Sequence, residues 1–252
     1  MNDSEFFHHP SWHEPWNHPD FTIPHDERLA RWKSQGWFKD RRRASVEFMG
    51  RLKWPWGFII YRTVYTPESD RLWSACLDKI EGSVRRDIDE SGEKYADQYP
   101  ERILKETFKN VILEDRECWD FASVEQIRAD FIAYLQSMGS SIGDDVPRST
   151  VCLVINDACL QSIRNTFDEP ENNRGSWAPT GFVGAIDPDY TEGQSYDNME
   201  YRGFMRVQIT SLYELVAGQL GYFSMHEVCP IMYHDMYPRV VDPRKVPLYK
   251  GL

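Results

Sequence analysis

The hydrophobic pattern is clearest in residues 57–88, where it changes from a strand-like to a helix-like spacing. Residues 58–65 are rich in aromatic and β-branched side chains, the types that fit a pleated, half-buried surface. Thr66 then suits an N-cap and Pro67 the first helical turn, where its missing N–H costs nothing. Apolar residues follow at steps of three and four positions, at Leu72, Trp73, Cys76, Leu77, Ile80, Val84 and Ile88. This spacing predicts an interior strand over 58–65 and a helix over 67–84 that packs on its sheet.

Similar changes of spacing predict four more strands and three more helices. The best-marked helix begins at a capping box formed by Ser123 and Gln126 and ends at Gly139. A short helix is expected after Asp157, and a last one is expected where Ser211 and Glu214 repeat the capping pattern. Residues 91–106 are polar and predict a surface connection or a broken helix. The four further strands are expected at 111–113, 150–155, 181–186 and 203–209.

Five strands that alternate with about four helices, without an internal repeat, predict a single domain with a helix-covered sheet. The strands lack the long aliphatic runs of a large parallel sheet, so an α+β fold is favoured over α/β, and a ferredoxin-like arrangement is one candidate. We divide the chain into three parts. Residues 1–50 form an extended arm rich in histidine, proline and aromatics with a short helix, residues 51–220 the α+β core, and residues 221–252 an aromatic and proline-rich tail that wraps the core.

Composition narrows the functional classes. The formal net charge is −11, so a nucleic-acid partner is not expected, and the one basic run, at 39–43, reads as a solvated turn. There is no apolar run of signal-peptide or membrane length, so we expect no membrane partner. The five cysteines lack CxxC spacing, which favours a cytoplasmic, reducing setting in which Cys76 and Cys152 are buried thiols.

No metal or cofactor is expected from the motifs. Five of the seven histidines lie in the first 25 residues, but prolines separate them and they lack the spacing of a metal site. A phosphate-binding P-loop, a dinucleotide GxGxxG, a GxSxG elbow and an HExxH motif are all missing from the sequence. The prediction is therefore a protein that works without a nucleotide cofactor and without a metal.

The candidate chemistry starts from two arginines inside predicted strands, Arg62 and Arg206. A strand with apolar residues on both faces leaves Arg62 little access to water, so its guanidinium needs a carboxylate partner. Asp115 and Glu117, at the end of the second strand, are the expected partners. Two readings stay open: a structural clamp between strands, or an open site for an anion or carbonyl.

In the second reading, a tyrosine of the same strand, Tyr61 or Tyr65, donates a proton. His226, beside Glu227 in the tail, becomes a candidate general base if the tail folds over the pocket. The catalytic candidates are therefore Arg62, Asp115, Tyr61 and His226, and the binding candidates are Tyr65, Glu117 and Arg206.

Three segments together carry a resemblance: WGFIIYRTVYTPESDRLW, ILEDRECWDFASVEQIRADF and GFMRVQITSLYEL. Their pattern, which covers about residues 56–220, resembles a large family of uncharacterised fungal intracellular proteins. The resemblance implies an α+β fold and a fungal source, and it implies no active site.

Two functions from different classes remain at this point. The first is a small-molecule enzyme of specialised (biosynthetic) metabolism, of the isomerase, cyclase or hydrolase type. The second is a non-catalytic protein that binds a ligand or another protein, to which the 14% aromatic content would contribute. An aromatic surface could also join two copies of the chain. An enclosed pocket with converging charges favours the first function, and a flat aromatic patch favours the second.

Overall fold

The computed structural model describes residues 19, 22–39, 43–52, 56–144, 147–166, 181–192, 201–220 and 223–228. Their five strands form one mixed sheet in the order β2-β1-β3-β4-β5, which is not closed into a barrel. β1 pairs in parallel with β2 and β3, whereas β3–β4 and β4–β5 are antiparallel. The chain therefore forms a single domain of the α/β-type mix. The strands are β1 (Ile59–Arg62), β2 (Val111–Leu113), β3 (Cys152–Ile155), β4 (Phe182–Ile186) and β5 (Phe204–Gln208).

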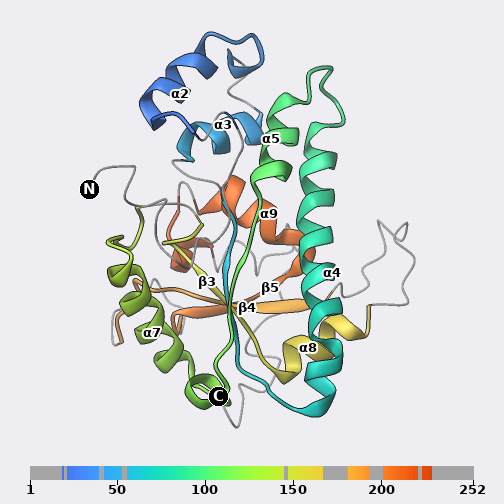
Figure 1. Cartoon of the computed structure of the whole chain (residues 1–252), viewed down its shortest axis with the longest axis vertical. Helices are drawn as coiled ribbons and strands as arrows, with labels where there is room; N and C mark the ends of the chain where they lie inside the picture. Colours follow the sequence, from blue (N-terminus) through green and yellow to red (C-terminus); the bar gives the residue numbers. More distant parts are fainter. Residues whose placement is uncertain are drawn as a thin grey trace.

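Helices cover both faces of this sheet (Figure 1). The long helix α4 (Pro67–Gly92) and α8 (Asp157–Arg164) lie on one side, and α7 (Val124–Ser137) lies on the other. Side chains alternate along β1, so Ile60 joins the core beneath α4, whereas Ile59 and Tyr61 join a second core with Phe131 of α7. The sheet thus separates two hydrophobic cores.

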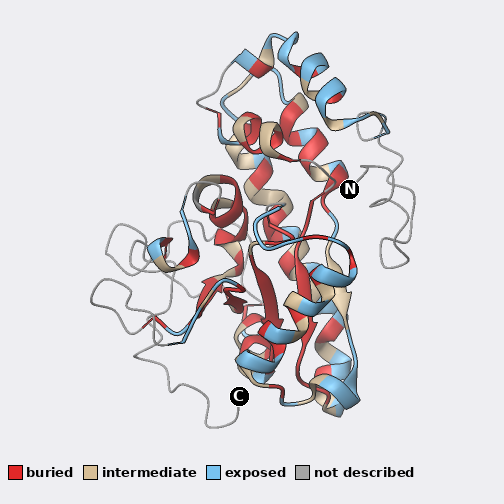
Figure 2. Cartoon of the chain, turned by 90° about the vertical axis from the view of Figure 1, so that its left-hand side faces the viewer, coloured by how far each residue is buried: buried red, intermediate tan, exposed pale blue. Residues whose placement is uncertain are grey.

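A group of helices packs around the C-terminal half of α4, beyond the sheet (Figure 1). It contains α2 (His25–Lys33), the 3₁₀ turn η3 (Trp37–Lys39), α3 (Ala44–Arg51) and α5 (Tyr99–Thr107). Their inward faces are buried, as Figure 2 shows. Aromatic rings join this group to the sheet, because Phe48 of α3 packs edge-on against Trp56, with ring centroids 5.0 Å apart.

A buried ion pair holds α3 to α5. Arg43, the residue before α3, is 3% exposed and donates through Nε to Glu101 Oε1 over 2.8 Å, and its second contact is with Glu101 Oε2. The Ser45 hydroxyl also donates to Glu101, and the Arg43 guanidinium lies 4.1 Å from the centroid of the Tyr95 ring. The expectation of a solvated turn at 39–43 is therefore wrong at Arg43.

At Gly57, just before β1, the backbone passes very close to the chain that precedes β2. Its φ of 156° lies in a region that other residues rarely adopt, and a Cβ atom there would lie 1.9 Å from the Lys109 carbonyl oxygen. The flanking residue Trp56 donates its N–H to Thr107 O and accepts from Lys109 N–H at 2.8 Å. The absence of a side chain at Gly57 lets this backbone pairing continue beyond the strand ends.

The local predictions around the capping signals are confirmed. β1 is an interior strand, and α4 starts at Pro67 with a capping box at Thr66, although α4 runs on to Gly92. α7 has the predicted box between Ser123 and Gln126. Gly139, with a φ of 67°, follows its end. Cys76 and Cys152 are buried thiols, as expected.

Other expectations are corrected. The sheet is not the antiparallel one of a ferredoxin-like fold, because β2, β1 and β3 run parallel. The described residues contain more helices than four. For residues 91–106 the structure has the broken helix, one of the two alternatives expected: α4 ends at Gly92, and α5 buries Ile103 and Leu104. Ser211 does not cap a helix with its side chain, because the 3₁₀ turn Ile209–Ser211 precedes α9 (Leu212–Glu214) and the π turn η5 (Leu215–Gln219).

The ends of the chain lie largely outside the described residues. This applies to four of the five histidines of the predicted arm and to the tail beyond residue 228. In the described part, α3 crosses the expected boundary at residue 50, and its Val46, Phe48 and Met49 belong to the main core. No helix among the described residues is long and apolar enough to cross a bilayer. The same residues contain no group of three His, Cys, Asp or Glu side chains placed to hold a metal ion.

Candidate functional site

The predicted site around Arg62 is a hydrogen-bonded network at the C-terminal end of β1. Arg62 is 5% exposed, and its guanidinium donates to Val64 O, to Ser69 Oγ and to the carboxylates of Asp70 and Glu114. The Tyr65 and Trp73 rings lie over the guanidinium, at 4.7 and 4.8 Å. The guanidinium is therefore already engaged by four acceptors and two rings of the protein, which supports the structural reading of Arg62 as a clamp.

The expected partners of Arg62 are wrong, although the expectation of a carboxylate pair is right. Asp115 caps the short helix α6 (Arg116–Trp119) by accepting the N–H groups of Glu117 and Cys118. These hydrogen bonds lower the pKa of the Asp115 carboxyl. The physical reason for the error is that β2 ends at Leu113, so the strand alternation that put Asp115 and Glu117 on one face does not continue.

The remaining predicted residues do not converge with Arg62, apart from Tyr65. The Tyr65 hydroxyl donates to Arg62 O and accepts from Asp115 N–H, which ties the ends of β1 and β2 together. Tyr61 points to the opposite face of the sheet, where its hydroxyl donates to Asp130 of α7 over 2.8 Å, and burial raises the pKa of that hydroxyl. Arg206 lies in β5 at the other end of the strand order, with its guanidinium 4.6 Å from the centroid of the Phe182 ring.

The usual ligand position of an open α/β sheet is closed in this protein. In the order β2-β1-β3 that position lies beyond the C-terminal ends of β1 and β3, where the chain reverses its direction of winding. There Thr63 N–H donates to Ile155 O over 3.0 Å, and Phe121 N–H donates to Thr63 O over 3.2 Å. Phe121 has a φ of 58° and is 69% exposed, so the α6–α7 connection covers the strand ends with its backbone.

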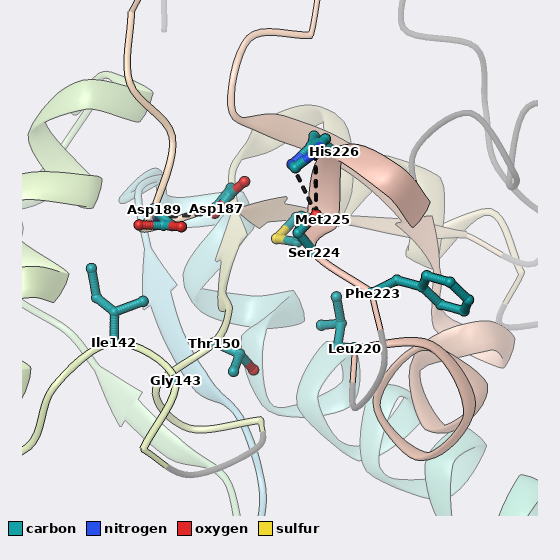
Figure 3. Close-up of a pocket in the computed structure, with 10 residues that line it drawn as sticks. All are labelled: Ile142, Gly143, Thr150, Asp187, Asp189, Leu220, Phe223, Ser224, Met225 and His226. Atoms are coloured by element: carbon teal, nitrogen blue, oxygen red, sulfur yellow. Dashed lines mark hydrogen bonds between the residues drawn. The ribbon is translucent and has the colours of Figure 1, made fainter. Parts of the chain in front are cut away.

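A cavity lies instead at the opposite end of the strands, where β3 begins and β4 ends (Figure 3). Its volume is about 320 Å³. Thr150 precedes β3 and Asp187 follows β4. Because β3 and β4 are antiparallel, both residues lie at the same end of the strands. The segment after η5 provides the remaining wall. The described lining residues are Ile142, Gly143, Thr150, Asp187, Asp189, Leu220, Phe223, Ser224, Met225 and His226.

Asp187 is the buried acid of this cavity, with 6% of the residue exposed. Its Oδ1 accepts the N–H of Asp189 over 2.9 Å, and its Oδ2 accepts the hydroxyl of Tyr201 over 2.8 Å. Burial raises the pKa of the Asp187 carboxyl, and these two hydrogen bonds and nearby Arg128 oppose the rise only in part. Asp187 therefore keeps an ionisable group in a poorly solvated position, which is typical of functional sites.

Arg128 of α7 fixes the backbone that carries Asp187. Its Nε donates to Asp187 O over 2.8 Å and its Nη2 to Gly203 O over 3.0 Å, while the guanidinium lies 4.9 Å from the centroid of the Tyr190 ring. Gly203 has a φ of 70°, and a Cβ atom there would lie 2.2 Å from Tyr190 Cγ. Arg128 and Gly203 are therefore positioning residues for the acidic end of the cavity.

His226 lies on a short helical turn beside this acid. Ser224 Oγ is 2.9 Å from His226 Nδ1 and donates to Glu227 Oε2 over 2.7 Å, while the Ser224 N–H donates to the same oxygen over 2.8 Å. The Tyr201 ring, whose hydroxyl holds Asp187, packs against the imidazole with centroids 6.4 Å apart. Tyr201 thus contacts both Asp187 and His226.

Of the residues predicted to act, the structure places only His226 in the cavity. Sequence reasoning missed Asp187 as a site residue, although the triplet Asp187-Pro188-Asp189 directly after a buried strand was a usable signal. The convergence of Asp187 with His226 depends on the antiparallel β4, which brings residues 39 positions apart to one cavity.

Replacing Asp187 with asparagine is expected to flatten the pH dependence of stability. Burial raises the pKa of Asp187 in the folded state. In the wild type this contribution to the free energy of unfolding is fully present below the ordinary aspartate pKa, and it is lost as pH rises through the raised pKa. Asparagine has no charge to bury. The melting temperature of the variant, relative to wild type, should therefore increase from pH 4 to pH 8, as thermal melts would measure.

Asp78→Asn, which removes an exposed carboxylate of α4, is the matched control for the loss of one charge. A difference between Asp187→Asn and wild type that is the same at both ends of this pH range would contradict the assigned burial cost.

Comparisons of the chain with protein-family models, with curated proteins and with solved structures found no match.

Proposed function

We propose that this chain is a small-molecule enzyme that transfers protons in the cavity of Asp187 and His226, without a nucleotide cofactor. An isomerase, cyclase or hydrolase reaction fits this chemistry. The observation that carries the proposal is that a buried carboxyl group and an imidazole line one cavity and share Tyr201 as a neighbour. Paired ionisable groups in different environments are the usual arrangement of a general acid and a general base.

The two groups take different parts in this proposal. Asp187 is buried and fixed by Tyr201 and by the backbone, so it keeps one orientation toward the cavity. His226 is less buried and is oriented by the Ser224 hydroxyl. One group removes a proton from the substrate while the other donates a proton at a second atom, so the net charge of the pair is unchanged, and proton exchange with solvent then returns both groups to their starting states.

A non-catalytic ligand-binding protein is the second candidate. The observation that favours it is the arrangement around Ser224, whose N–H and hydroxyl both bind Glu227 in the manner of a helix cap. In this reading the contact between Ser224 and His226 stabilises the helical turn, and the cavity only holds its ligand.

The proposal can be tested by solvent deuterium exchange. The wild type is incubated in D₂O with a panel of amine, neutral and carboxylate metabolites, and NMR follows the loss of C–H signals and the growth of product signals. We expect at least one compound to be labelled or converted, and His226→Gln to lower that rate by about 100-fold or more, the usual effect of losing a general acid or base.

His25→Gln, which changes a histidine at the start of α2, is the control and should keep the wild-type rate. An unchanged rate in His226→Gln would remove the assigned role. A panel in which compounds bind but none is labelled or converted would favour the non-catalytic candidate.

The cellular setting is also part of this proposal. The buried thiols Cys76 and Cys152 and the net charge of −11 support a cytoplasmic protein whose partner is a small molecule rather than a nucleic acid. A source among the fungal proteins named above, and association of two copies through aromatic surface, remain proposals of the same kind.

A further inference from the structure

Among the described residues that line the cavity, the acidic side chains outnumber the basic ones: Asp187 and Asp189 face the single imidazole of His226. Asp187 and Asp189 lie side by side at one end, as Figure 3 shows, and no lysine or arginine is among the described lining residues. Arg128, the cation behind Asp187, donates to backbone carbonyls and lies over the Tyr190 ring. A carboxylate or phosphate ligand would therefore meet two acidic side chains, with His226 as the one ionisable nitrogen among the described lining residues.

The carboxylates keep acceptor capacity for a ligand. A carboxylate has about four acceptor positions, and Asp187 uses two of them for Asp189 N–H and the Tyr201 hydroxyl. Among the described residues, the Asp189 side chain accepts no hydrogen bond, and Asp189 is exposed at the cavity. Charged donors such as an ammonium group make the strongest hydrogen bonds to such oxygens.

Apolar side chains also line the cavity, beside the polar Thr150, Ser224 and His226. Leu220 and Met225 are buried and point toward the cavity, and Ile142 is 39% exposed at its edge. The Phe223 ring turns away from these side chains in Figure 3. A volume of about 320 Å³ is near the lower end of ligand pockets, which are about 300–1,000 Å³, and so it suits a small organic molecule.

We propose that the cavity binds a small organic cation, an amine with an apolar body. Its ammonium group pairs with Asp187 and Asp189, and its body packs against Ile142, Leu220 and Met225. The negative potential of the whole chain also favours the approach of a cation. This inference rests on the proposed function, because it names the substrate class of the same cavity.

Three probes of similar size and shape differ in charge: benzylamine is a cation, benzyl alcohol is neutral and benzoate is an anion. Ligand-observed NMR titrations at neutral pH with the full chain would give their dissociation constants. We expect benzylamine to bind at least about tenfold more tightly than benzyl alcohol, the factor that one charged hydrogen bond supplies. Benzoate is expected not to bind, and methylamine should bind more weakly than benzylamine because it lacks the apolar body.

Variants locate the binding. Asp189→Asn, at an exposed position, should lose most of the preference for benzylamine over benzyl alcohol, and Asp78→Asn should keep it. Equal binding of the amine and the alcohol, stronger binding of benzoate, an unaffected Asp189→Asn, or no benzylamine binding at millimolar concentration would each overturn the inference.

The outcomes also separate this inference from the proposed function. Benzylamine binding that depends on Asp189, together with no proton exchange in any metabolite, would leave the cation site standing and remove the enzyme. Exchange that depends on His226 but occurs in neutral or acidic metabolites and is indifferent to Asp189→Asn would leave the enzyme standing and remove the cation site.

Discussion

Replacing Glu101 with alanine is expected to lower the free energy of unfolding by about 3–5 kcal/mol, the usual cost of breaking a buried ion pair. Both partners are buried, with side-chain exposures of 3% for Arg43 and 2% for Glu101. Without Glu101, the Arg43 guanidinium keeps the Asp97 carbonyl, at 2.6 Å, and the Tyr95 ring as contacts but loses its charged partner. The Ser45 hydroxyl loses its acceptor as well. Urea unfolding followed by circular dichroism measures this change.

A double variant separates the charge from the packing. Arg43→Met combined with Glu101→Leu removes both charges and keeps most of the volume, so it should be more stable than Glu101→Ala alone. The surface control is Glu81→Ala, since Glu81 pairs with Arg85 over 2.8 Å where both side chains are partly exposed. Its expected cost is below about 0.5 kcal/mol. A Glu101→Ala variant no less stable than Glu81→Ala would contradict the role given to the pair.

Gly57→Ala is expected to have the second large effect, a loss of about 4 kcal/mol or more, or failure to fold. The added methyl group would lie 1.9 Å from Lys109 O and 2.4 Å from Lys109 C, both of them backbone atoms. No side-chain rotation can relieve such an overlap. The φ of 156° adds strain for any residue with a Cβ. Soluble yield and urea unfolding curves of the variant give the result.

The control for Gly57→Ala lies in the middle of α4. Gly82 is exposed, and a Cβ atom there would meet nothing within 4 Å. Gly82→Ala should therefore raise stability by about 0.5–1 kcal/mol, the difference between the two residues inside a helix. If Gly57→Ala lost less than about 1 kcal/mol, the close approach between β1 and residue 109 would not have the importance assigned to it.

The parts of the fold that were predictable from sequence are those that local chemistry decides. The Thr66–Pro67 start of α4 and the box at Ser123 and Gln126 require residues only three positions apart. Strand direction is different, because whether β3 runs parallel to β1 depends on how the intervening helices cross the sheet. For residues 91–106 the sequence left a surface connection and a broken helix both open, because α5 is nine residues long and has only a narrow apolar face at Ile103 and Leu104.

The candidate site was predictable only where a residue could be recognised from its own type and its immediate neighbours in the sequence. His226 stood out as an imidazole beside an acid in the sequence, and the structure places it at the cavity. Asp70, in contrast, is eight positions from Arg62 and reaches it because α4 folds back at once after β1. The sequence pointed to Asp115 instead, since residue alternation was extended past the end of β2. Pairings that depend on a turn of the backbone were therefore the ones that failed.

The shortness of β2 has a consequence for the behaviour of the protein at high concentration. β2 is an edge strand, and edge strands offer backbone groups on which another chain can add and begin aggregation. Its apolar run, Val111–Leu113, has only three residues and stands between Lys109 on one side and Glu114 and Asp115 on the other. A second molecule that paired with this edge would gain few hydrogen bonds and would have to desolvate charges at both ends. The length of β2 thus protects this edge of the sheet from intermolecular growth while still covering one side of β1.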